Sequence, residues 1–122
     1  MFVINSLYQG SPLSVFYEMD DSTQMWLYAR TFAKILQHDD ADEAVLKRVS
    51  EYNLCRYGEI VNNTIDQVPT NVHDINQDSL FVTGHGLLEL INNTKVSSAT
   101  DNLREYVELD LLPFMYNRIV FD

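Results

Sequence analysis

The chain has 122 residues, of which 46% are hydrophobic, and this size and composition suit one globular domain with one modest core. Eight Lys and Arg against 18 Asp and Glu give a formal net charge of −10, the reverse of the basic surface that phosphate-binding proteins usually carry. Bulk charge therefore argues against a nucleic-acid binder, and any such function would depend on a local cluster of cations.

The start of the chain shows no targeting signal. Met1-Phe-Val-Ile-Asn-Ser6 lacks a basic segment and a long apolar segment, and no apolar run in the chain approaches the thickness of a bilayer. The single cysteine, Cys55, has no partner for an internal disulfide, as is usual in a reducing compartment. We therefore expect an intracellular protein that does not enter a membrane.

Strand signals dominate the first 28 residues. Val15-Phe-Tyr-Glu-Met19 and Met25-Trp-Leu-Tyr28 are rich in aromatic and β-branched residues, and Asp20-Asp-Ser-Thr23 between them is typical of a turn. These segments predict a β-hairpin. Phe2-Val-Ile4 suits an additional edge strand, which we expect Gly10-Ser-Pro12 to separate from the hairpin.

A pair of short helices is predicted next. Phe32, Ile35 and Leu36 recur at helical spacing after residue 28. Asp40 and Glu43 then have the spacing of a capping box, and an apolar stripe follows between residues 41 and 49. Helices joined so closely suit a helix-turn-helix-like or αα-hairpin arrangement, although this geometry is common.

The middle of the chain gives weaker signals. Leu54-Cys-Arg-Tyr57 and Ile60-Val61 suit short strands, and the segment from Val68 to Asp78 is typical of a polar loop. Phe81-Val82 reads as the end of a strand. Thr83 is then placed to cap a helix, whose expected buried face is Leu87, Leu90 and Ile91.

A last helix is predicted from Ser98, with Asp101 three residues later as its capping partner. Its expected buried face consists of Leu103, Tyr106, Val107 and Leu111. Pro113 is expected to stop or kink this helix, so that residues 114–121 fold back over the core. The order of elements predicts one α+β domain over residues 1–122, with an N-terminal hairpin, a short helix pair, further strands and a C-terminal helix pair.

Two segments near the C-terminus resemble a known family. Phe81-Val-Thr-Gly-His-Gly-Leu-Leu-Glu-Leu-Ile91, followed by Leu103-Arg-Glu-Tyr-Val107 and Leu111-Leu-Pro113, is similar to the Bro-N domain of baculovirus repeated ORF proteins, related insect DNA viruses and phage antirepressors. The front half fits the same pattern, so the resemblance covers about residues 13–116. It implies a non-enzymatic viral or phage-like regulator that binds DNA or nucleoprotein in transcription or replication, within the host cytoplasm or nucleus.

The candidate nucleic-acid-binding residues are the cations in the middle of the chain. Phosphates are bound by Lys and Arg, and most of the Lys and Arg lie between residues 30 and 56. The candidates are Arg30, Lys34, Lys47, Arg48 and Arg56, with Asn53 as a further member. The alternative is that these are ordinary surface cations that offset nearby acids.

A second hypothesis follows from the acidic remainder of the chain. Glu105 stands where the family pattern has a basic residue, and Phe114-Met-Tyr116 replaces basic residues after Pro113. A diverged, acidic copy of the domain would bind a host or viral protein, mimic nucleic-acid phosphates, or pair with itself. Phe114, Tyr116 and Phe121 are candidates for self-association, unless they cap the domain's own core.

No catalytic, cofactor or metal site is expected. Cys55 and His85 show no spacing that indicates a nucleophile and its base, and a small buried thiol is the simpler interpretation of Cys55. His38 and His73 each neighbour aspartates but lack a spaced set of metal ligands. Gly84-His-Gly86 is too short to cradle a phosphate, so we expect these glycines to allow close packing at a helix start.

Overall fold

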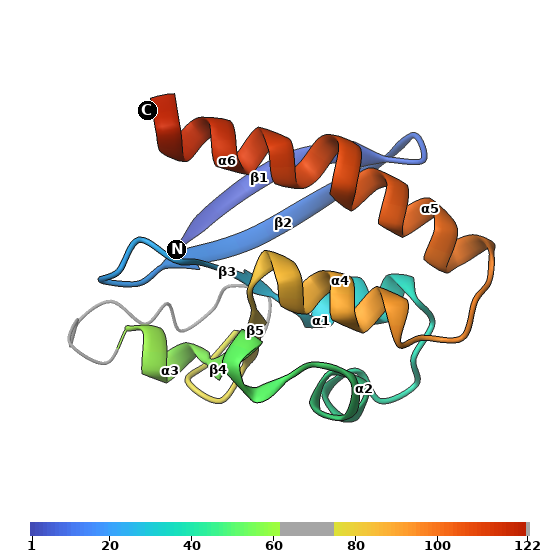
Figure 1. Ribbon diagram of the computed structural model, residues 1–122, viewed down its shortest axis with the longest axis horizontal. Coiled ribbons are helices and arrows are strands. Elements are labelled where there is room, and N and C mark those ends of the chain that lie inside the picture. Colours follow the sequence, from blue (N-terminus) through green and yellow to red (C-terminus); the bar gives the residue numbers. More distant parts are fainter. Residues whose placement is uncertain (62–74, 122) are drawn as a thin grey trace.

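The computed structural model describes residues 1–61 and 75–121, the side chains of residues 118–121 excepted. Its centre is a five-stranded antiparallel sheet, and helices cover the sheet (Figure 1). In spatial order the strands are β1 (Phe2–Tyr8), β2 (Ser11–Met19), β3 (Met25–Tyr28), β5 (Leu80–Val82) and β4 (Leu54–Arg56). The predicted α+β class is confirmed. Residues 68–74 of the predicted polar loop, which runs from Val68 to Asp78, lie outside the described residues.

Neighbouring residues along the strands enter two different apolar clusters, because side chains alternate between the faces of a sheet. Leu27 and Val82 join the larger cluster. Its other members come from β1, β2, α1 (Arg30–Ile35), α2 (Ala41–Arg48), α4 (Gly84–Asn92) and the C-terminal helix, which begins at Ser98. Tyr28 and Phe81 join the smaller one, which also contains the fully buried Tyr57. The sheet is thus buried on both faces at its centre.

The chain begins with a hairpin whose first strand, β1, is longer than the sequence indicates. β1 (Phe2–Tyr8) pairs with β2 (Ser11–Met19) along its whole length, with Tyr8 opposite Ser11. Gln9 and Gly10 have φ values of 52° and 79°, as a two-residue type I′ turn requires. The interpretation of Gly10-Ser-Pro12 as a separator was therefore wrong, because Gly10 closes the turn and Pro12 already lies in β2. The predicted hairpin, β2 with β3 (Met25–Tyr28), is confirmed.

The two remaining strands come from distant parts of the chain. β5 (Leu80–Val82) lies between β3 and β4 (Leu54–Arg56), so both predicted strands are confirmed. The strand predicted at Ile60-Val61 was wrong, because Tyr57–Ile60 forms helix α3 after the 3₁₀ turn η1 (Glu51–Asn53). Helical spacing lets Tyr57, Ile60 and Val61 all pack against the smaller apolar cluster.

The predicted helices before residue 98 are confirmed, and so are the cap residues predicted for two of them. They are α1 (Arg30–Ile35), α2 (Ala41–Arg48) and α4 (Gly84–Asn92). Asp40 Oδ1 accepts from the Glu43 amide at 3.1 Å, and Thr83 Oγ1 accepts from the Gly86 amide at 3.0 Å.

The cap of α5 (Ser98–Tyr106) lies one residue earlier than predicted. Ser97 is the N-cap, because Ser97 and Thr100 form two reciprocal hydrogen bonds. The Thr100 amide donates to Ser97 Oγ at 3.4 Å, and the Ser97 amide donates to Thr100 Oγ1 at 2.9 Å. Ser98 is therefore the first helical residue and not the cap.

Pro113 neither stops the last helix nor turns the chain back. α5 continues through a π-helical turn, η2 (Val107–Leu111), into α6 (Leu112–Phe121), and together they form one long rod across the β1–β2 hairpin (Figure 1). The Leu112 amide donates to the carbonyl of Val107, five residues back. This wider turn accommodates a proline that lacks an N–H and whose ring crowds the preceding turn. The buried face predicted for this helix is confirmed at all four positions.

Candidate nucleic-acid interface

The α1–α2 pair presents a surface on which cations and carboxylates alternate. α1 ends at Ile35 with Leu36 as its C-cap, and Gln37 takes a left-handed conformation (φ 67°) that turns the chain toward Asp40. Two adjoining hollows of about 340 and 260 Å³ lie over this connection. Together they are lined by the set that we call the helix-pair surface: Arg30, Lys34, His38, Lys47 and Arg48, with Asp39, Asp40, Asp42 and Glu43.

Two of the predicted cations are neutralised by neighbouring acids. Arg30 Nη2 lies 3.2 Å from Asp42 Oδ2, and Lys47 forms an ion pair with Glu43 one helical turn away. Asp42 and Glu43 also lie in the first turn of α2, and Lys47 in its last turn, where each charge opposes the helix dipole. These charges therefore have a structural role whatever else they bind.

Lys34 and Arg48 remain available for a ligand. Within the described parts of the chain, neither forms an ion pair with a carboxylate. Arg48 Nη1 makes one long hydrogen bond of 3.4 Å to the carbonyl of Ala44, and its buried Nε has no partner among the described residues. The Nε is too deeply buried to meet a ligand, so a phosphate or carboxylate would reach Arg48 at the terminal nitrogens of its half-buried side chain.

His38 lies between the two hollows and adds little positive charge. Its Nε2 lies 2.9 Å from Thr94 Oγ1, and that hydroxyl donates to the carbonyl of Leu90, so His38 is the donor to Thr94. Burial and the nearby Arg48 guanidinium lower the pKa of His38. The contact between His38 and Thr94 attaches the helix-pair surface to the end of α4, a connection that sequence spacing does not indicate.

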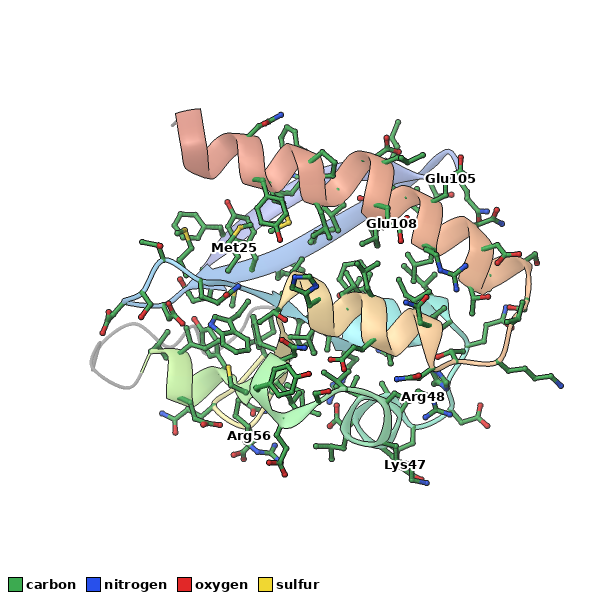
Figure 2. All side chains as sticks on the ribbon, viewed as in Figure 1. Met25, Lys47, Arg48, Arg56, Glu105 and Glu108 are labelled. Carbon is green, nitrogen blue, oxygen red and sulfur yellow. The ribbon has the colours of Figure 1, made fainter. Side chains whose placement is uncertain are left out.

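Arg56 and Asn53 are not part of this surface. Arg56 lies on β4, apart from Lys47 and Arg48 on α2 (Figure 2), and its Nη1 donates to the carbonyl of Asp78 at 2.8 Å. Asn53 uses its amide inside the fold, where Nδ2 donates to Glu89 at 2.8 Å. The structure thus brings together four of the five predicted cations.

A family model agrees with this fold and with the resemblance. The model for the BRO family N-terminal domain, Bro-N, matches residues 14–113, which is most of the chain. The chain belongs to the Bro-N family. Among solved structures, it is similar to the N-terminal domain of Orf22, a Cydia pomonella granulovirus envelope protein, with 18% identity and a TM-score of 0.49. That alignment covers 87% of this chain and 97% of the other. Comparison with curated proteins gives no match.

The aromatic residues proposed for self-association lie on α6 of this Bro-N domain. Phe114 and Tyr116 are 46% and 50% exposed, whereas Met115 between them is buried. Phe114 also lines a hollow beside β1, and the Tyr116 hydroxyl lies close to Gly84 at the start of α4. Each ring thus has one side against the domain and one side toward solvent. The side chain of Phe121 lies outside the described residues.

Cys55 lies in an environment that disfavours the thiolate. Burial, with Glu59 and Asp20 adding to its effect, raises the pKa of the Cys55 thiol to about 12. His85 is exposed at the start of α4. Over the described ranges, no three His, Cys, Asp or Glu residues are placed to hold a metal ion, and no helix is long and apolar enough to cross a bilayer.

We expect Cys55 in the folded Bro-N domain to react with iodoacetamide, at about pH 8, at least about tenfold more slowly than free cysteine. The thiolate is the reacting species, and a raised pKa leaves little of it. Mass spectrometry of timed samples measures the rate, and the same reaction in guanidinium chloride is the control. A native rate equal to the unfolded rate would contradict the raised pKa.

Proposed function

We propose that this Bro-N domain is a non-enzymatic regulatory module of viral or phage-like type, which engages DNA or nucleoprotein through the helix-pair surface and modulates transcription or replication in the host cytoplasm or nucleus. One observation carries the proposal. Four of the eight Lys and Arg gather around one connection, in a chain whose net charge is −10.

The charge of the helix-pair surface differs from that of the rest of the chain. Its four cations and four carboxylates sum to zero (4 − 4 = 0, with His38 neutral), so the other residues carry the whole −10. A phosphate approaching the molecule therefore meets less repulsion here than over the acidic parts of the chain. Because Arg30 and Lys47 are already paired, only Lys34 and Arg48 are available to neutralise phosphates. This shortage favours nucleoprotein, in which a basic protein offsets part of the phosphate charge, over bare duplex.

The test is a titration with three probes: a labelled DNA duplex, the same duplex assembled with an arginine-rich peptide, and that peptide alone. Each is measured by fluorescence anisotropy between about 50 and about 200 mM salt. We expect the duplex–peptide assembly to bind most tightly. Two phosphate contacts predict a logarithmic salt slope of about −2 for the DNA-dependent part.

Charge reversal identifies the surface. Lys34→Glu and Arg48→Glu are each expected to weaken binding by about fivefold or more, since each removes one phosphate contact and adds repulsion. Arg56→Glu is the matched control, because it makes the same change of charge away from the helix pair. Absence of salt-sensitive binding to either DNA probe, or an equal loss with Arg56→Glu, would rule the proposal out.

The C-terminal helix favours a second candidate, an acidic module that binds a basic protein. Glu105, Glu108 and Asp110 are exposed along this helix beside Leu109, which is 67% exposed, and Figure 2 shows Glu105 and Glu108 away from the α2 cations. This candidate predicts tight binding of the arginine-rich peptide alone. Glu105→Lys and Glu108→Lys would then abolish the binding, and Arg48→Glu would leave it unchanged.

A further inference from the structure

β1 is an edge strand whose outer side has no partner among the described residues. It pairs with β2 alone, and the register runs from Phe2 opposite Tyr17 to Tyr8 opposite Ser11 without a bulge. In a hairpin with a two-residue type I′ turn, the residues that flank the turn form a hydrogen-bonded pair. Every second residue from Tyr8 toward the start of β1 therefore forms its backbone hydrogen bonds with β2. The N–H and C=O groups of the residues between them, Val3, Asn5 and Leu7, therefore point away from the sheet.

This edge lacks the features that normally prevent strands from pairing. Residues 1–17 contain no charged side chain, and β1 contains no proline. The opposite edge, β4, differs in length and charge: it has three residues, ends in Arg56, and runs directly between η1 and α3. Short length and charge protect an edge, whereas a long, neutral and regular edge is a template for another strand.

The exposed side chains of β1 are complementary to a second β1. Val3 and Leu7 are 49% and 67% exposed, on the face opposite the buried Ile4. In an antiparallel pair with a twofold axis at Asn5, Val3 of each copy lies opposite Leu7 of the other, and the two Asn5 side chains face each other. Aliphatic and amide pairs of this kind stabilise neighbouring strands.

We propose that two copies of this chain join through β1, antiparallel and about a twofold axis at Asn5, to form one continuous sheet. The twofold match of Val3 with Leu7, and of Asn5 with itself, selects a second copy as the occupant. Each chain carries a net charge of −10, so pairing needs an edge without charged side chains, and residues 1–17 provide it. The hollow of about 240 Å³ beside this edge, lined in part by Ile4, Asn5 and Phe114, lets the incoming strand also cover the exposed side of Phe114.

This pairing is independent of the function proposed above. Figure 1 shows β1 and α2 on opposite sides of the molecule, so the helix-pair surface of both copies stays open. The salt dependence of the two events is also opposite. Salt screens the repulsion between acidic copies and strengthens the dimer, whereas it weakens binding to DNA.

Sedimentation equilibrium of the whole chain tests the pairing at about 0.1 M and about 1 M salt. We expect a monomer–dimer equilibrium that shifts toward dimer at the higher salt. Leu7→Lys places a charge on the edge, and Asn5→Pro removes an outward N–H that β2 does not use; each is expected to weaken the dimer by about tenfold or more.

Val96→Lys is the matched control, because Val96 is 74% exposed in the loop between α4 and α5, away from β1. It is expected to leave the dimer unchanged, and circular dichroism checks that all variants are folded. A wild type that is monomeric at every concentration and salt would overturn the proposal. A dimer that Leu7→Lys and Asn5→Pro leave intact would also overturn the proposal. The same holds for a dimer that dissociates only with Phe114→Lys or Tyr116→Lys.

Discussion

Replacing Gly86 with alanine is expected to lower the free energy of unfolding by about 2–3 kcal/mol. An alanine Cβ there would lie 2.7 Å from the carbonyl oxygen of Asn53 and 3.1 Å from Val49 Cγ1. The nearest atom belongs to the backbone, and the same carbonyl accepts from the Thr83 amide at 3.0 Å. Relieving the clash therefore requires η1 and the start of α4 to separate.

Gly84→Ala is the control for this substitution, in the same turn of α4. Its Cβ would meet the Tyr116 hydroxyl at 3.2 Å and Leu112 Cδ2 at 3.3 Å, the ends of side chains that can adjust. Both substitutions gain up to about 1 kcal/mol of helix propensity, so the difference between them isolates the clash. Urea unfolding measures both variants, and equal stabilities would contradict the packing described for Gly86.

Replacing Glu89 with alanine is expected to cost about 2–3 kcal/mol, because hydrogen bonds to a charged group are among the stronger ones. Glu89 Oε1 accepts from the Ser50 amide at 3.2 Å and from Asn53 Nδ2 at 2.8 Å, and Oε2 accepts from the Ser50 hydroxyl. These bonds attach α4 to the segment that leaves α2. Glu105→Ala, at an exposed carboxylate on α5, is the control and is expected to change stability little.

The pH dependence of this site follows from the pKa of Glu89. Burial alone would raise it, but the hydrogen bonds from Ser50 and Asn53 outweigh burial and lower it. The carboxylate then stabilises the fold above its unfolded pKa of about 4.3, and this contribution is lost as pH falls through the lowered folded value. The difference in the free energy of unfolding between wild type and Glu89→Gln is therefore expected to be largest at about pH 7 and to decrease below about pH 4. A difference that increases on acidification would contradict this sign.

Local chemistry accounts for much of what the sequence could predict. Asp40 and Thr83 cap their helices because a side-chain oxygen three residues before an amide can reach it in any fold. The apolar residues of α4 and α5 are buried as their helical spacing predicts. The four cations of the helix-pair surface lie together because both helices and their short connection come from one segment.

Errors arose where a distant segment decided the outcome. Ile60 is the last residue of α3 and Val61 is its C-cap, because the buried Tyr57 ring stacks on Phe81 at 5.2 Å and the chain turns across that face of the sheet. Arg56 lies away from the other four predicted cations because its strand pairs with β5, which comes more than twenty residues later in the chain. Neither contact leaves a signal in the spacing of nearby residues.

By itself, then, the sequence determined the β2–β3 hairpin, four helices with the buried faces of α4 and α5, and the family, because each depends on residues within a turn or two of one another. Only the tertiary structure decided that β5 enters between β3 and β4 and that Gly86 and Glu89 hold the segment after α2. Those features are set by pairing between residues far apart in the chain, whose energies depend on the whole packed sheet and not on local pattern.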